Sequence, residues 1–210
     1  MELLRTANLP NAITVVRVLM APAIVYLIFV PGFAPRLAAF SVFLVAALSD
    51  LCDGYLARRF GWITDFGKLL DPIADKLLLA ATLIPIFLLS HRPDSLGVGP
   101  LPYWGTLPLW VLLVILAREV LVTVLRVVAA NRGVVLAAGS AGKHKTATQN
   151  VFIGAVLLWY AFEGAVWESV LFAWFRVFHG LILAGSLALA VVLTVYSLVV
   201  YLWQWQRMRR

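Results

Sequence analysis

The chain has 210 residues, of which 63% are hydrophobic and only 13% are charged, and its formal net charge is +7. A soluble domain carries about 25% charged residues. The composition therefore excludes an ordinary soluble domain and predicts an all-α integral membrane protein. The basic balance is typical of Lys and Arg that lie beside anionic lipid headgroups, so membrane lipid is an expected partner and nucleic acid is not.

Six apolar segments follow one another along the chain, each close to the roughly 20 residues that cross a bilayer. They predict six transmembrane helices at about 12–30, 37–59, 67–90, 107–130, 146–162 and 177–203. The residues before the first span form a short juxtamembrane segment. No internal repeat or linker interrupts the pattern, so residues 1–210 are expected to form a single membrane domain.

The basic residues at the ends of the spans and in the segments between them are distributed unequally between the two sides of the membrane. The segments on the side of the N-terminus hold Arg5, Arg58, Arg59, Lys68, Arg132, Lys143, Lys145, Arg207, Arg209 and Arg210. The opposite loops hold Arg36, Arg92 and Arg176. Since Lys and Arg concentrate in cytoplasmic loops, both termini and the turn after the second span are expected in the cytoplasm.

Four aspartates lie inside the second and third spans, where a charge costs at least ~2.5–3.5 kcal/mol. At about 100° per residue, Asp50 and Asp53 share one helix face, and Asp71 and Asp75 lie one turn apart on the next helix. Two antiparallel helices would bring the four carboxylates to one level, face to face. They are therefore expected to line a shared polar cavity rather than to face lipid.

Clustered carboxylates need cations to neutralise them. Oxygen-only ligands favour Mg²⁺ or Mn²⁺, and two carboxylate pairs predict two ions, as in sites that displace phosphoryl groups. Intramembrane aspartates also mark cation or proton transporters, which is the alternative class. The small residues Gly54, Ala57 and Gly67 around the aspartates, and the position at a cytoplasmic turn, favour an enzyme.

The pattern Asp-x2-Asp-Gly-x2-Ala-Arg-x8-Gly-x3-Asp-x3-Asp is met in full by Asp50, Asp53, Gly54, Ala57, Arg58, Gly67, Asp71 and Asp75. It resembles the signature of the CDP-alcohol phosphotransferase family. The resemblance implies a six-helix, homodimeric protein of the bacterial inner membrane with a two-metal site facing the cytoplasm. It also implies transfer of a phosphatidyl or similar group from a CDP-linked donor to an alcohol, with release of CMP.

The resemblance assigns roles within the signature. The four aspartates would hold the metal ions, and Asp75 would also be the general base. The donor site would comprise Gly54, Ala57, Arg58, Gly67 and Asn11. Residues 8–22, 116–126 and 142–149 resemble the members of the family that use CDP-diacylglycerol and glycerol 3-phosphate, whereas the final span is only generically similar.

An acceptor that carries its own phosphate needs a basic pocket. The candidates, with the last two completing the pocket or contacting the nucleotide, are Arg118, Arg126, Lys143, Lys145, Thr14 and Arg17. Glu119 is expected to pair with an intramembrane arginine and orient it. Inositol phosphate, serine, or phosphatidylglycerol in a cardiolipin-type reaction remain alternative acceptors.

Overall fold

The computed structural model of the protein describes residues 8–60, 65–92, 98–132, 140–163 and 170–208. Within these ranges the chain forms six helices: α2 (Asn8–Phe29), α3 (Phe33–Phe60), α4 (Asp65–Ser90), α6 (Leu109–Asn131), α7 (Ser140–Glu163) and α8 (Val170–Met208). The described residues form no strand, and one isolated bridge pairs Leu101 with Gly105. The prediction of an all-α protein is therefore confirmed.

Apolar stretches of membrane-spanning length occur in four helices of the described chain. They are Asn11–Phe29, Phe33–Asp50, Leu70–Ser90 and Phe172–Arg207. Large apolar side chains such as Leu19 and Val120 are exposed, and such surfaces suit contact with lipid. The protein is accordingly a membrane protein. The apolar stretch of α6 is interrupted by three charged residues, Arg118, Glu119 and Arg126. Neither α6 nor α7 is among the four helices, so a bundle of six spans stays a prediction.

The helices extend beyond the apolar segments that predicted them. Helix α7 begins at Ser140 rather than near 146, and α8 begins at Val170 rather than near 177, so two predicted loops were too long. Apolarity marks only the residues that would lie in hydrocarbon, whereas a helix continues for as long as its backbone groups remain paired. Between α2 and α3, Gly32 has φ of 112°, a left-handed conformation that glycine adopts without steric penalty.

The described structure divides into two compact units. The first contains the chain up to Gly99 together with the end of α7 from Leu157, and the second contains Pro100–Val156 and α8.

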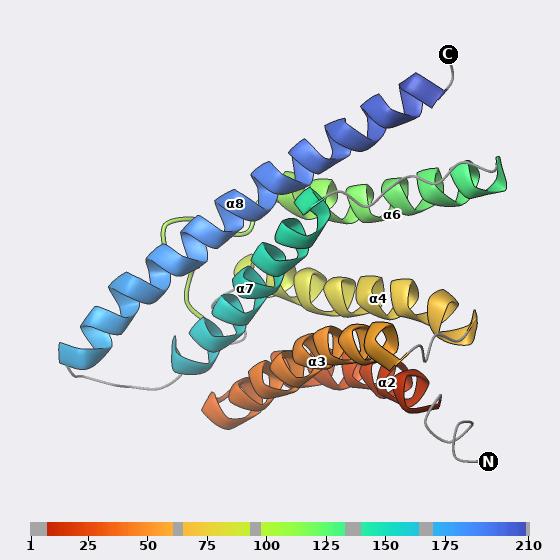
Figure 1. Ribbon diagram of the computed structural model, residues 1–210. Helices are drawn as coiled ribbons and strands as arrows, with labels where there is room; N and C mark the ends of the chain where they lie inside the picture. Colours follow the sequence, from red (N-terminus) through yellow and green to blue (C-terminus); the bar gives the residue numbers. More distant parts are fainter. Residues whose placement is uncertain (1–7, 61–64, 93–97, 133–139, 164–169, 209–210) are drawn as a thin grey trace. The chain divides into compact units, whose positions relative to one another are not determined.

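In the first unit, α2 packs against both α3 and α4 (Figure 1). Thr14 contacts Asp71 and Arg17 contacts Asp75, so α2 and α4 run in the same direction. The buried stripe of α2 has helical spacing of three and four residues and consists of Thr14, Arg17, Ala21, Ile24 and Ile28. Buried alanines on the packed faces, including Ala39, Ala46 and Ala74, allow the close backbone approach that is typical of membrane helices.

In the second unit, α6 and α8 run in the same direction, because Arg118 contacts Ser197 and Arg126 contacts Tyr201. An apolar cluster between these helices contains Val122, Ala129 and Tyr201, with Leu125, Leu198 and Trp205 packed against it. Helix α7 runs opposite to α8, since Gln149 contacts Thr194 and Ala155 contacts His179. The C-terminal ends of α6 and α8 therefore lie at the same end of this unit as the start of α7.

Candidate active site

The carboxylates of the first unit gather around a buried arginine. Nη1 of Arg17 donates to Oδ1 of Asp50 at 2.7 Å and to Oδ1 of Asp75 at 3.2 Å. The three residues come from α2, α3 and α4, so one guanidinium nitrogen joins three helices. The carboxylates of Asp50 and Asp75 therefore share a single positive charge.

Asp71 has a separate partner on α2. The hydroxyl of Thr14 donates to Oδ1 of Asp71 at 2.7 Å. Thr14 and Arg17 are both buried and lie three residues apart at the polar end of the α2 stripe, which brings them to one helix face. Each carboxylate that the structure describes in this group is thus oriented by a side chain of α2.

The donor set of this group suits a hard divalent cation. The possible metal ligands are all carboxylate oxygens, which such cations prefer. The Oδ1 atoms of Asp50 and Asp75 lie close enough together to contact one cation, the guanidinium of Arg17. Among the described side chains, no three carboxylate, imidazole or thiol groups gather closely enough to hold an ion by themselves. The side chain of Asp53, one turn after Asp50 on α3, lies outside the described part. The role of Asp53 as a metal ligand stays a prediction.

The residues predicted to bind the donor are only partly described. The side chains of Ala57 and Arg58, and the surroundings of Gly54, lie outside the described residues, although all three belong to α3. Gly67 is buried in the first turn of α4, and Asn11 is half-buried on α2, three residues before Thr14. Their assignment to the donor stays a prediction.

In the second unit the structure gathers three of the predicted basic residues. Nη1 of Arg118 donates to Oε1 of the neighbouring Glu119 at 3.3 Å, and the buried Lys145 of α7 forms an ion pair with the same oxygen. Nε of Arg118 donates to Oγ of Ser197 on α8 at 3.0 Å. The expected pairing of Glu119 with an arginine is confirmed for Arg118, whereas the place of this pair within the membrane stays a prediction.

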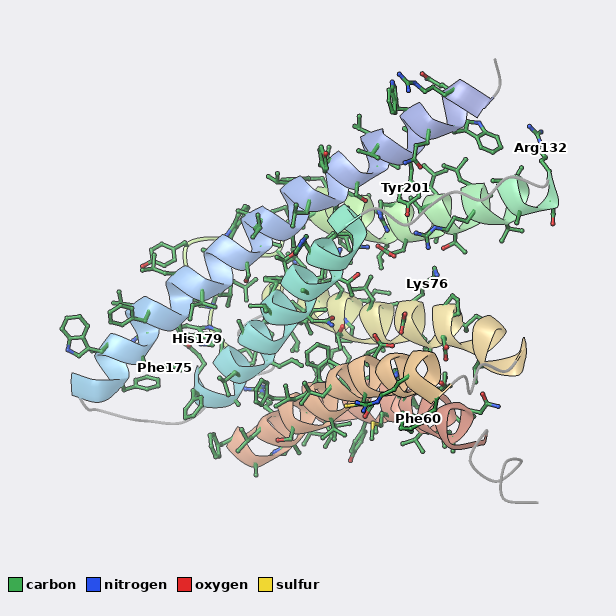
Figure 2. The ribbon with its side chains drawn as sticks, viewed as in Figure 1. Phe60, Lys76, Arg132, Phe175, His179 and Tyr201 are labelled. Carbon is green, nitrogen blue, oxygen red and sulfur yellow. The ribbon has the colours of Figure 1, made fainter. Side chains whose placement is uncertain are left out.

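Arg126 joins this group through Tyr201. A guanidinium nitrogen of Arg126 donates to the hydroxyl of Tyr201. The Cζ atoms of Arg118 and Arg126 lie 5.6 Å and 5.1 Å from the centroid of the Tyr201 ring, respectively. Figure 2 shows Tyr201 on the side of α8 that faces α6. We call Arg118, Glu119, Arg126 and Lys145 the basic group.

The other three predicted acceptor residues are Thr14, Arg17 and Lys143. Thr14 and Arg17 contact carboxylates of the first unit. The side chain of Lys143 lies outside the described residues. The contact of Thr14 and Arg17 with an acceptor phosphate stays a prediction, but their described partners are the aspartates.

Ser197 and Tyr201 were not among the residues predicted from the sequence. Both lie on α8, which reads as a generic apolar span. A signal was present, because Thr194, Ser197 and Tyr201 are polar and recur at spacings of three and four residues, so they share one helix face. Periodicity alone would not have indicated which helix that face contacts.

Comparison with known proteins identifies the family of the chain. Residues 7–205 match the CDP-alcohol phosphatidyltransferase family. The chain therefore belongs to this family, and the resemblance inferred from the signature is confirmed. The family generally depends on divalent metal ions, which fits the oxygen donors of the first unit.

Several relatives are similar over most of the chain. A probable phosphatidylglycerophosphate synthase of Mycobacterium tuberculosis is 40% identical over 157 residues, which cover 73% of this chain and 68% of that protein. A CDP-diacylglycerol–glycerol-3-phosphate 3-phosphatidyltransferase of Bacillus subtilis is 37% identical, covering 72% and 77%. An Arabidopsis thaliana protein of the same name, numbered 2, is 35% identical, covering 94% and 79%.

Proposed function

We propose that the protein transfers the phosphatidyl group of CDP-diacylglycerol to glycerol 3-phosphate, giving phosphatidylglycerophosphate and CMP in phospholipid biosynthesis. The observation that carries the proposal is the set of relatives named for this reaction, at 35–40% identity over most of the chain. The two charged groups of the structure support it, because the reaction needs both a cation-binding site and an anion-binding site.

The aspartates of the first unit carry the chemistry. Asp50, Asp53, Asp71 and Asp75 would hold Mg²⁺ or Mn²⁺, two ions in our proposal, which when bound would neutralise the diphosphate of the donor. Arg17 and Thr14 hold the described carboxylates in place. The side chain of Asp75 is 53% exposed and is accessible to substrate.

Asp75 acts as the general base. Its carboxylate takes the proton of the acceptor hydroxyl, and the hydroxyl oxygen forms a bond to the β-phosphorus of CDP-diacylglycerol. The bond from that phosphorus to the oxygen bridging it to CMP breaks, and CMP leaves with the electron pair. A positioned base contributes about 10²–10⁴-fold to such a rate.

The basic group recognises the phosphate of the acceptor. Three cations and one carboxylate give the described group a formal charge of +2. A phosphate monoester carries about −1.5 to −2 at neutral pH, so glycerol 3-phosphate matches this charge. Phosphatidylglycerol is a monoanionic diester and serine carries no phosphate, which places both behind glycerol 3-phosphate as acceptors. Inositol phosphate has the same dianionic group and is the alternative within the family.

We further propose a multi-pass protein of the bacterial inner membrane with both termini and the active site on the cytoplasmic side, acting as a homodimer with one domain over residues 1–210. The excess of basic residues on one side supports this orientation. The family match over residues 7–205 supports a single domain.

The test is an acceptor panel. Purified protein receives CDP-diacylglycerol and Mg²⁺, with glycerol 3-phosphate, inositol phosphate, serine or phosphatidylglycerol, and CMP release is measured. We expect turnover with glycerol 3-phosphate, its loss in EDTA and its recovery with Mg²⁺ or Mn²⁺. Turnover with another acceptor in place of glycerol 3-phosphate, or turnover without metal, would refute the proposal. Ion flux into proteoliposomes without CDP-lipid would favour a transporter.

A further inference from the structure

The buried face of α8 changes character along its length. From its middle toward its C-terminus this face consists of Leu183, Leu187, Ala190, Thr194, Ser197 and Tyr201, all of them buried. The first three are apolar and the last three are polar. Buried polar groups in a membrane helix are expensive unless they are paired, and they commonly serve function. The change occurs where α8 faces the arginines of α6.

Ser197 accepts two hydrogen bonds from the guanidinium of Arg118. Its hydroxyl oxygen accepts from Nε of Arg118 at 3.0 Å and also from Nη2 of the same guanidinium. Nη1 of Arg118 donates to Glu119. The guanidinium is therefore held along one edge by α8, which fixes its plane, while the ion pair with Glu119 comes from its own helix.

Tyr201 lies between two like charges. Arg118 and Arg126 stand eight residues apart on α6, yet both guanidiniums lie within 6 Å of one ring. The face of an aromatic ring attracts cations, and the Tyr201 hydroxyl accepts from Arg126. The ring thus offsets part of the repulsion between two cations that converge on it.

We infer that Ser197 and Tyr201 are positioning residues that hold Arg118 and Arg126 as a clamp for a phosphate monoester dianion. This inference rests on the proposed function, since it names the residues that shape the acceptor site. Two pre-oriented guanidiniums bind a phosphate without first losing the rotamer freedom of long side chains. Neither Ser197 nor Tyr201 needs to touch the substrate.

A purely structural role for these polar groups is the competing explanation, and the chain supplies a matched control. Thr194 belongs to the same buried face, and Nε2 of Gln149 donates to its hydroxyl at 3.2 Å. This bond joins α7 to α8, and both of its partners are neutral. Thr194→Val removes it with little change in volume.

The experiment compares Ser197→Ala, Tyr201→Phe and Thr194→Val with the unmodified protein, all purified at full length. Titration calorimetry gives the Kd of inorganic phosphate, and CMP release gives KM for each substrate. We expect the first two variants to raise the phosphate Kd and the KM of glycerol 3-phosphate roughly tenfold, as when a charged donor loses an acceptor. The KM of CDP-diacylglycerol should stay within about twofold in all variants.

The outcomes separate this inference from the proposed function. An unchanged phosphate Kd in Ser197→Ala and Tyr201→Phe, or an equal rise in Thr194→Val, would overturn the inference even if glycerol 3-phosphate is the acceptor. If the phosphate Kd values follow the expected pattern but the protein shows no turnover with glycerol 3-phosphate, the clamp is supported and the proposal that glycerol 3-phosphate is the acceptor is refuted. Gel-filtration profiles and melting temperatures verify folding, and Tyr201→Phe, which keeps the ring, carries the test if Ser197→Ala fails to fold.

Discussion

In each of the two units, one charged side chain contacts two side chains of the opposite charge, and the signs are reversed between the units. In the first unit one arginine, Arg17, contacts two carboxylates, and in the second one carboxylate, Glu119, contacts two cations. The described charges sum to −2 around Arg17, with Asp50, Asp71 and Asp75, and to +2 in the basic group. Each group thus carries an internal countercharge and keeps an excess of formal charge.

The exposure of the charges differs between the units. The side chain of Arg17 is 1% exposed, whereas those of Asp50 and Asp75 are 36% and 53% exposed. In the second unit the cations Arg118 and Lys145 are 6% and 3% exposed and Glu119 is 18% exposed. The first unit therefore exposes its carboxylates, whereas the second buries two of its cations beside their partners.

The strongest test of the first unit is Asp75→Asn, which removes the base and keeps the size of the side chain. We expect CMP release to fall by about 10²–10⁴-fold, because the attacking hydroxyl would keep its proton. Lys76→Gln is the neighbouring control, since the Lys76 ammonium donates to the backbone oxygen of Pro72 at 2.9 Å and to none of the aspartates whose side chains the structure describes. Equal losses in both variants would argue against a specific role for Asp75.

Arg17→Gln tests the internal countercharge of the first unit. Removing the buried guanidinium leaves the carboxylates of Asp50 and Asp75 to repel each other. We expect the free energy of unfolding to fall by about 2 kcal/mol, which is the order of magnitude for hydrogen bonds to charged groups. Thermal melting measures this loss. Mg²⁺ should raise the melting temperature of the variant more than that of the unmodified protein, because a divalent ion can replace the missing charge. An equal rise in both proteins would contradict this account.

Glu119→Gln is the reciprocal change in the second unit. It raises the charge of the basic group from +2 to +3 and removes an internal competitor for phosphate. We expect the melting temperature to fall and the KM of glycerol 3-phosphate to decrease by about threefold, on the order of 0.6 kcal/mol. Steady-state kinetics and thermal melting test both effects. A raised KM would instead mean that Glu119 holds the cations in the orientation that phosphate needs.

The smallest effect is expected from Thr194→Val, which lies in the second unit but contacts neither arginine. Hydrogen bonds between membrane helices average about 0.6 kcal/mol. The variant should melt slightly below the unmodified protein and retain its KM for glycerol 3-phosphate. A large loss of stability would show that the contact between α7 and α8 depends on this one bond.

Much of the first unit could be predicted because its residues are close in sequence. Asp50 and Asp75 belong to consecutive helices joined by a short connection, so these helices are expected to be antiparallel neighbours. Helix periodicity then indicates which face of each helix carries its aspartates. The family signature falls within the same stretch. In contrast, the contact between Arg17 and Asp50 was not predicted, since nothing in the sequence relates the face of α2 that carries Arg17 to that of Asp50, 33 residues away. The prediction that Arg17 completes the acceptor pocket or contacts the nucleotide stays a prediction.

The second unit depends on contacts that are far apart in the chain. Ser197 lies 79 residues from Arg118, and Tyr201 lies 75 residues from Arg126. The sequence by itself determined the helical fold, the membrane environment, the family and the polar residues of each helix, because these follow from local composition and spacing. Only the tertiary structure decided which polar faces meet, because the rotation of one helix against another is set by packing between residues distant in sequence.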